Sequence, residues 1–229
     1  MDALTLVIGN KNYSSWSMRP WVLLKQAGIE FEERKIRFDA FTPDSSFKTE
    51  LARLTPAGHV PVLIDGDLTV WDTLAIAEYV AEKFPAKQLW PKDAKARARA
   101  RSVCAEMHSG FGALRDQLPM NVEASLPDVG RRLLAEDGAV RADVDRIVEM
   151  WSGLLEAHGG PLLFGDFTIA DAYFAPVVMR LRTYGVPVPP AVAAYIGRVT
   201  ELPGVAAWIR DALAERDFLD FEEPYRTQA

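Results

Sequence analysis

Three serines stand near the N-terminus, in the run Tyr13-Ser14-Ser15-Trp16-Ser17, just before a stretch of helical pattern. Hydroxyl groups at a helix start lie where unpaired backbone N–H groups and the positive end of the helix dipole stabilise an anion. A thiolate is such an anion, and thiols at helix N-termini have lowered pKa values. The run therefore predicts either a thiolate-stabilising site or serines that only cap the helix.

The energetic requirement for such a site is modest. Lowering a thiol pKa of ~8.5 by about two units takes roughly 2.7 kcal/mol. One hydrogen bond from a hydroxyl to a charged acceptor contributes about 1.5–3 kcal/mol, and the helix start adds roughly 0.3–1 kcal/mol. Pro20 bears on this estimate, because proline is tolerated only in the first turn of a helix. Either the helix begins as late as Arg19 or its first turn is distorted, and a late start would weaken the stabilisation.

A second stretch with binding character ends in a predicted helix start. Val62–Ile64 and Leu68–Trp71 are typical of two β-strands, and Asp65–Asp67 between them has the composition of a hairpin turn. Asp72 then precedes a run of helical period that begins at Thr73, so Asp72 is a good N-cap. A plain hairpin followed by a capped helix is one interpretation of this segment.

The other interpretation gives the segment a ligand. Pro61 stands just before the first of these strands, where its missing N–H does no harm. A cis bond before Pro61 would expose the backbone of Val60 to an extended peptide, which could pair with it as an added strand. The free N–H groups at the helix start near Thr73 would hold a carboxylate. The segment thus predicts a clamp for a small anionic peptide.

This segment resembles the glutathione-binding half of the glutathione S-transferase family. The resemblance is carried by Thr55-Pro56-x-x-x-Val60-Pro61-x-Leu63 and by the following Asp72-Thr73-Leu74-Ala75-Ile76. It implies that Val60, with Pro61, holds the cysteinyl part of glutathione, and that Asp72 and Thr73 hold its γ-glutamyl end. His59 stands where the family often has lysine or glutamine beside the glycine carboxylate of glutathione. A histidine N–H could serve there, and an exposed loop histidine is the alternative.

The serine run is similar to the serine motif of the zeta class of the same family, in which the first serine assists the glutathione thiolate. The resemblance implies that Ser14 is the catalytic hydroxyl, with Ser15 as the second candidate and Ser17 inside the helix start. Trp16 stands where the zeta motif has cysteine. This departure puts the isomerase activity of that class, which acts on maleylacetoacetate, in doubt.

A long helix is predicted at about Pro91–Leu118, after a linker that contains two prolines. It contains two internal glycines, which are costly in a helix and indicate close packing or a pocket wall. In the family this helix lines the pocket for the acceptor substrate, so the resemblance implies Met107, His108 and Phe111 as candidates. Ordinary helix packing is the alternative for all three.

Further helices are predicted in the rest of the chain, at about Pro127–Ala157 with an interruption near Asp137-Gly138, and at Ile169–Thr183, Pro190–Thr200 and Gly204–Glu215. Thr168-x-x-Asp171 is a variant of the N-capping box. It resembles a pattern in the helical domain of glutathione transferases, which implies a structural role for Asp171. The acidic, aromatic tail from Asp217 either covers the pocket or is free of it.

The predicted order of elements is βαβαββα, followed by helices only. This order predicts an α/β thioredoxin-like N-terminal domain followed by an all-α helical bundle. We expect residues 1–84 to form the glutathione-binding domain, residues 85–92 the linker, and residues 93–229 the helical substrate-binding domain.

The bulk composition narrows the function classes. A net charge of −6 over 229 residues argues against nucleic-acid binding. Cys104 is the only cysteine, which excludes an internal disulfide, a CxxC redox pair and a cysteine-rich zinc site, and no metal is expected. Neither a basic signal-peptide start nor an apolar run of ~20 residues is present, so we expect a soluble cytoplasmic protein without a membrane partner.

Taken together, the resemblance implies a glutathione transferase that uses glutathione as co-substrate, attacks a small electrophile and forms a homodimer. Two alternatives stay open. One is a glutathione-dependent cis–trans isomerase of the maleylacetoacetate type. The other is a non-enzymatic binding module of the same fold.

Overall fold

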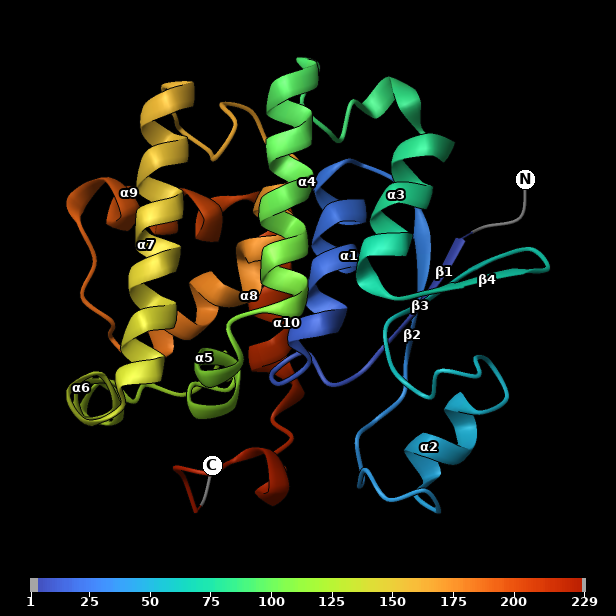
Figure 1. Ribbon diagram of the computed structural model, residues 1–229. Helices are drawn as coiled ribbons and strands as arrows, with labels where there is room; N and C mark the ends of the chain where they lie inside the picture. The colour runs from blue at the N-terminus through green and yellow to red at the C-terminus, as the bar shows by residue number, and fades with distance from the viewer. Residues whose placement is uncertain (1–3, 228–229) are drawn as a thin grey trace.

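The computed structural model describes residues 4–227 of the chain. Its first half contains a four-stranded sheet of order β2-β1-β3-β4, formed by β1 (Leu4–Ile8), β2 (Phe31–Lys35), β3 (Val62–Asp65) and β4 (Leu68–Trp71). Strand β1 runs parallel to β2 and antiparallel to β3, and β3 and β4 form the predicted hairpin. The helices of this half are α1 (Ser15–Gln26), α2 (Ser46–Leu51) and α3 (Thr73–Lys83). Figure 1 shows α1 and α3 side by side between the sheet and the helices of the second half, whereas α2 lies apart from them at the lower right.

The central strand β1 is buried on both faces. Leu4, Leu6 and Ile8 belong to the large hydrophobic core, whereas Val7 packs in a smaller cluster on the other face with Phe38. This division follows from the two-residue period of a strand. Covering both faces of the sheet fixes the end of β1 and the start of β3, where the serine run and the Val60-Pro61 loop adjoin the sheet.

Helix α1 begins well before Pro20, although a proline is expected only in the first turn of a helix. Ser14 is its N-cap, Ser15 is its first residue and Pro20 lies within it. Of the two alternatives for this helix, a start as late as Arg19 is therefore wrong. Proline at this position removes the hydrogen bond that its N–H would give to the carbonyl of Trp16, but the surrounding contacts keep the helix.

The second half is helical throughout. Its elements are η1 (Pro85–Lys87), α4 (Ala94–Ser109), α5 (Gly112–Gln117), α6 (Pro127–Glu136), α7 (Gly138–His158), α8 (Ile169–Thr183), α9 (Pro190–Glu201), α10 (Pro203–Glu215) and η2 (Asp220–Glu222). Helix α8 lies at the centre, and all of its residues except Arg182 are buried. Among the described helices, none combines the length and the apolar character that crossing a membrane requires.

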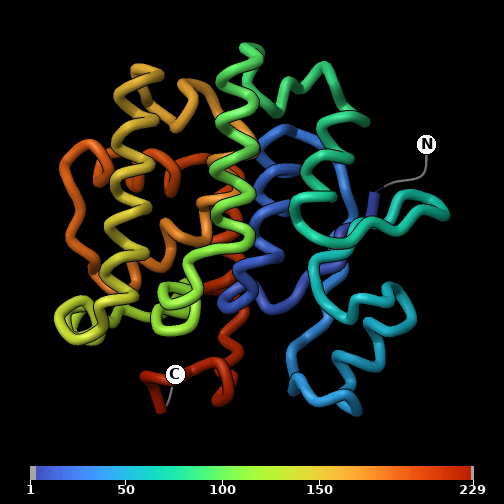
Figure 2. Tube along the Cα trace, viewed as in Figure 1, coloured from blue at the N-terminus to red at the C-terminus, as the bar shows by residue number. Residues whose placement is uncertain are grey.

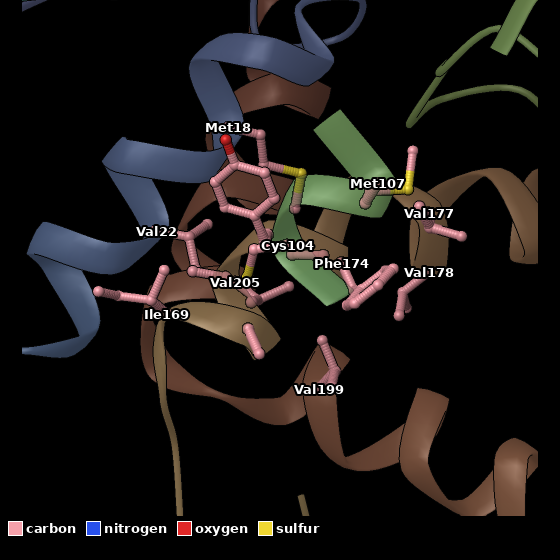
Figure 3. Packing of buried hydrophobic residues seen from close by; sticks show 14 of the residues in the cluster. Met18, Val22, Cys104, Met107, Ile169, Phe174, Val177, Val178, Val199 and Val205 are labelled. Atoms are coloured by element: carbon pink, nitrogen blue, oxygen red, sulfur yellow. The ribbon is translucent and has the colours of Figure 1, made fainter. Parts of the chain in front are cut away.

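The core joins the two halves of the molecule. Figure 3 shows Met18 and Val22 of α1 packed with Cys104 of α4 and with Phe174 and Val178 of α8. Because α1 contacts both α8 and α10, the helix that begins at the serine run is held from the helical side as well as by the sheet. The predicted α/β thioredoxin-like half and helical half are thus both present, and the order of elements is confirmed.

Two predicted helix boundaries have different outcomes. The single helix expected at Pro91–Leu118 is wrong, because Gly110 is extended and Phe111 adopts a left-handed φ of 57°, which separates α4 from α5. The interruption expected near Gly138 is confirmed, since Asp137 ends α6 and caps α7 by accepting hydrogen bonds from two backbone N–H groups. The domain boundary at residues 85–92 stays a prediction.

The predicted capping box at the start of α8 is confirmed. The Asp171 carboxylate accepts from the backbone N–H of Thr168 at 2.9 Å, and Thr168 Oγ1 accepts from the N–H of Ala170. Asp171 also accepts from the backbone N–H of Leu163 and from the Tyr195 hydroxyl. Burial nevertheless raises the pKa of Asp171 to about 6. These contacts fix the start of the central helix.

Candidate functional site

A cavity of about 710 Å³ opens between the sheet half and the helical half. Its wall is built from the start of α1, from α2, from the loop before β3, from the junction of β4 and α3, and from α4, α5, α8 and the tail. Cavities of this size hold small organic ligands. The wall includes every site residue that the sequence predicted outside the segment Met107–Phe111, namely Ser14, Ser15, His59, Val60, Pro61, Asp72 and Thr73.

The two candidate serines lie next to each other at the start of α1. Ser14 is buried, and its Oγ accepts from the N–H of Ser17 and donates to Ser17 Oγ at 2.7 Å. Ser15 is half-buried, and its Oγ accepts a hydrogen bond from Arg180 Nη2 at 3.2 Å. Both hydroxyl groups therefore lie at the positive end of α1, and an anion held there is stabilised by the helix dipole.

The loop before β3 forms another part of the wall. The peptide bond between Val60 and Pro61 is cis, as the ligand-binding interpretation of this segment supposed. His59 is exposed in the same wall. Lys48 of α2 also lines the cavity, and its Nζ donates to the carbonyl of Gly58 at 2.8 Å. Two side chains that can donate to an anion thus lie close to the backbone of Val60.

The junction of β4 and α3 supplies an acid and a hydroxyl. Asp72 has a positive φ of 74°, and its Oδ1 accepts from the backbone N–H of Leu74 at 2.8 Å, so the predicted N-cap is confirmed. Its carboxylate stays 46% exposed. Thr73 is buried, and its Oγ1 lies 2.6 Å from the Tyr173 hydroxyl. Aspartate tolerates the left-handed region better than most residues, which suits it to this bend.

Two family models match the chain. The N-terminal domain of glutathione S-transferase matches residues 13–83, and the C-terminal domain of glutathione S-transferase matches residues 77–211. The chain belongs to the glutathione S-transferase family. Its fold of a small mixed sheet with helices followed by a helical half is the fold of that family.

Known relatives agree with this assignment. Glutathione S-transferase 1 of Dianthus caryophyllus is 29% identical over 172 residues, which are 74% of either chain. A probable maleylacetoacetate isomerase of Caenorhabditis elegans is 26% identical over 182 residues, which are 77% of this chain and 79% of the relative. The crystal structure of a glutathione transferase homolog from Burkholderia gl BGR1, with bound glutathione, has a TM-score of 0.70 and 27% identity, and the match covers 93% of this chain and 100% of that one.

Of the three residues that were predicted to line the acceptor-substrate pocket, His108 lies in the cavity wall. Its Nε2 is 3.2 Å from Asp72 Oδ2, and its Nδ1 is 3.1 Å from the Tyr173 hydroxyl. Its ring meets Trp16 edge-on at 5.3 Å between centroids. Burial raises the pKa of Tyr173 to about 12, so this hydroxyl is neutral and can donate. His108 therefore connects the helical half to the acid of the β4–α3 junction.

The other two candidates are not in the wall. Met107 and Phe111 are 1% and 6% exposed and belong to the hydrophobic core, and Figure 3 shows Met107 among the buried side chains. Consecutive residues of a helix point about 100° apart, so His108 faces the cavity while Met107 turns into the core. Phe111 follows the break after α4, which redirects its side chain. The structure thus corrects the prediction that these two residues line the pocket.

Two arginines of the wall were not predicted. Arg180 of α8 is buried, and its Nη1 donates to the carbonyls of Arg115 and Leu118 at the end of α5. Burial, together with Arg19 and Arg115 nearby, lowers the pKa of Arg180 to about 10, so it stays charged at neutral pH. A charged residue within the long apolar run of α8, where charged side chains are rarely buried without a partner, is the sequence signal that could have identified it.

The tail contributes to the wall as well. Glu222 of η2 lines the cavity, and burial raises its pKa to about 7 against the opposing effect of Arg180. The next residue is anchored, because the Tyr13 hydroxyl donates to Glu223 Oε1 at 2.8 Å. Phe221 meets Phe41, of the loop before α2, at 5.3 Å. Figure 2 shows the red tail at the same end of the molecule as the light-blue segment that contains α2. Because Glu222 lines the cavity, the tail is not free of it, and whether it covers the cavity stays a prediction.

Proposed function

We propose that this protein is a glutathione transferase that joins the sulfur of glutathione to a small electrophile. The observation that carries the proposal is the convergence of three separated segments on one cavity: the serine run, the Val60-Pro61 loop and the Asp72-Thr73 helix start. A tripeptide with two carboxylates, one ammonium group and a thiol matches the groups that these segments offer.

Each part of glutathione has a complementary group in the wall. Lys48 and His59 would bind the glycine carboxylate, and the backbone of Val60 would pair with the cysteinyl residue. The γ-glutamyl ammonium would bind the Asp72 carboxylate, and its carboxylate would lie at the N–H groups of α3 beside Thr73. This orientation directs the sulfur toward the start of α1.

The chemistry then requires a thiolate. A serine hydroxyl at the start of α1 donates to the sulfur, whose proton passes to solvent, and the anion attacks the electrophile. A carbon–sulfur bond forms while a leaving group departs with its electron pair, or, on an activated double bond, the neighbouring carbon takes a proton from water. Holding both reactants in one cavity supplies much of the rate increase.

A cis–trans isomerase is the second candidate, and the relatedness to a probable maleylacetoacetate isomerase favours it. In that reaction the thiolate adds to a double bond, rotation follows, and the thiolate leaves again. Trp16 in place of a cysteine opposes this assignment. Conversion of a maleyl compound without net consumption of glutathione would establish the isomerase, and conjugates that accumulate in proportion to glutathione lost would establish the transferase.

The first experiment is retention on immobilised glutathione, followed by titration calorimetry with free glutathione. We expect retention and a single site per chain, and a homodimer in light scattering. Turnover is then screened with aryl halides, epoxides, peroxides and maleyl compounds. A protein that is folded but shows neither retention nor heat of binding would contradict the proposal and favour a non-enzymatic binding module.

A further inference from the structure

Ser14 and Ser15 are adjacent in the cavity wall, but their hydroxyl groups are engaged differently. Ser14 Oγ donates to Ser17 Oγ, which also accepts from the backbone N–H of Gly9. A hydroxyl has a single proton to donate. The Ser14 proton is therefore already used inside the helix start, and Ser14 must lose a buried hydrogen bond before it can donate to a ligand.

Ser15 has the opposite arrangement. Its oxygen accepts from Arg180 Nη2, and a guanidinium group can only donate. Within residues 4–227, the Ser15 hydroxyl donates to no other group, so its proton is available to a ligand in the cavity. A hydroxyl whose oxygen is held by a cation is also a stronger donor, because the charge polarises the O–H bond.

The charge around Ser15 favours an anion. Three arginines lie near the start of α1: Arg19, Arg115 and Arg180. In the described part of the chain, none of the three forms an ion pair with a carboxylate. Arg19 and Arg115 both lie over the ring of Trp16, at 4.3 and 5.6 Å from its centroid. Positive charge that is not neutralised lowers the pKa of a nearby thiol.

Glu222 only partly offsets this charge. It lies in the same wall, and its raised pKa of about 7 leaves it protonated in a large fraction of molecules at neutral pH. Asp72 is the other carboxylate of the wall, and Lys48, Arg115 and Arg180 oppose the two acids, so the wall keeps an excess of positive charge.

We propose that Ser15, rather than Ser14, donates the hydrogen bond to the glutathione sulfur, and that Arg180 is a positioning residue that acts through Ser15. Arg180 holds the Ser15 oxygen, so that the proton points into the cavity. The thiol loses its proton to solvent, and the Ser15 O–H and the charge of Arg180 stabilise the sulfur lone pair that remains. This inference rests on the proposed function, since it needs glutathione in the cavity.

The test compares matched serine variants. For the unchanged protein, Ser14→Ala and Ser15→Ala, the ultraviolet absorbance of bound thiolate is followed against pH at saturating glutathione, and the pH profile of turnover is recorded beside it. We expect Ser15→Ala to raise the midpoint of thiolate formation by about one unit or more, and turnover at neutral pH to fall by about tenfold or more. The glutathione dissociation constant should change by less than about threefold, because a single hydrogen bond to the sulfur contributes mainly to the anion. Ser14→Ala should shift the midpoint less.

Arg180 is tested through coupling with Ser15. Arg180→Lys keeps a charge but loses the planar group in which one nitrogen donates to two carbonyls and the other to Ser15. Arg180→Lys should raise the midpoint pH of thiolate formation when Ser15 is present, and should add little to it in the Ser15→Ala protein. A purely structural defect would instead lower the melting temperature and shift the midpoint equally in both proteins. Ser15→Thr keeps the hydroxyl, so its midpoint of thiolate formation should return to that of the unchanged protein. This variant tests the role of Ser15 even if Arg180→Lys does not fold.

Two outcomes overturn the inference. A midpoint that moves with Ser14→Ala and stays with Ser15→Ala returns the role to Ser14. Equal shifts from Arg180→Lys in both backgrounds remove Arg180 as a residue acting through Ser15. Either result leaves glutathione binding intact, and so it is distinct from failure of the proposed function, in which the unchanged protein itself would bind no glutathione.

Discussion

Asp72 Oδ2 lies 3.2 Å from His108 Nε2, and this contact crosses from the sheet half to the helical half. The same imidazole reaches the Tyr173 hydroxyl through Nδ1, and that hydroxyl reaches Thr73 Oγ1. The acid–hydroxyl pair at the start of α3 is thus held from α4 and α8 as well as by the local capping bond from Leu74 to Asp72. The orientation of the Asp72 carboxylate therefore depends on the helical half.

Substitution at this contact should weaken glutathione binding. In the proposed binding mode Asp72 pairs with the γ-glutamyl ammonium, so we expect Asp72→Ala to raise the dissociation constant about tenfold or more, as for loss of a charge-assisted hydrogen bond. His108→Phe keeps the ring beside Trp16 but loses both hydrogen bonds, and it should raise the constant by about threefold. Titration calorimetry measures both. In the Asp72→Ala background His108→Phe should have little further effect, and an undiminished effect there would show that His108 does not act through Asp72.

The carboxyl of Glu222 should make stability depend on pH. Its pKa rises from an ordinary 4.5 to about 7, because burial outweighs the attraction of Arg180, and Glu223 adds repulsion. At pH values between 4.5 and 7, the Glu222 carboxyl is protonated in the folded protein but ionised in the unfolded chain. The contribution of Glu222 to the free energy of unfolding therefore falls as the pH rises from 4.5 to 7. In Glu222→Gln the free energy of unfolding should fall by about 1–2 kcal/mol less over this pH range, after allowance for the partial exposure of the side chain.

The measurement is urea denaturation of both proteins at pH 5 and pH 8. The difference between the two proteins isolates Glu222 from the other groups that titrate. A stability difference that is the same at both pH values would contradict the raised pKa.

Two glycines provide a matched pair for packing. A Cβ on Gly130 of α6 would lie 1.9 Å from the carbonyl oxygen of Tyr184, whereas a Cβ on Gly153 of α7 would meet no atom within 4 Å. Gly130→Ala should therefore lower the free energy of unfolding by about 2 kcal/mol or more, because the facing atom is backbone. Gly153→Ala should raise it by up to about 1 kcal/mol through helix propensity. Thermal denaturation followed by circular dichroism checks both, and equal effects would mean that α6 does not approach Tyr184 closely.

The single cysteine should take no part in turnover. Cys104 is completely buried, and burial raises the pKa of its thiol far above the ordinary range. Cys104→Ala should retain glutathione turnover while losing about 1–2 kcal/mol of stability from the cavity it leaves. An aromatic disulfide reagent should label the thiol only after unfolding. Loss of turnover in a folded Cys104→Ala protein would instead point to a thiol mechanism of the chain's own.

Local sequence was sufficient for the features that short segments specify. Asp72 before a helical run, the turn between β3 and β4, and the Thr168–Asp171 box each depend on hydrogen bonds to residues at most a few positions away. The side chains and backbone groups involved are contiguous, so the pattern alone predicted them. The order of strands and helices followed from the same local signals, and it led to the correct fold class.

The contacts that make the cavity a site are of another kind. The hydrogen bond from Arg180 to Ser15 joins residues 165 positions apart. The approach of His108 to Asp72 also depends on how α4 packs beside α3. No periodicity or motif encodes such distances, and a single residue step along α4, a rotation of about 100°, decides that His108 faces the cavity while Met107 is buried. The sequence by itself thus determined which chemical groups are present and in which local elements. Only the packing of the helical half against the sheet half decided which of those groups meet, because side-chain contacts depend on the relative placement of whole helices.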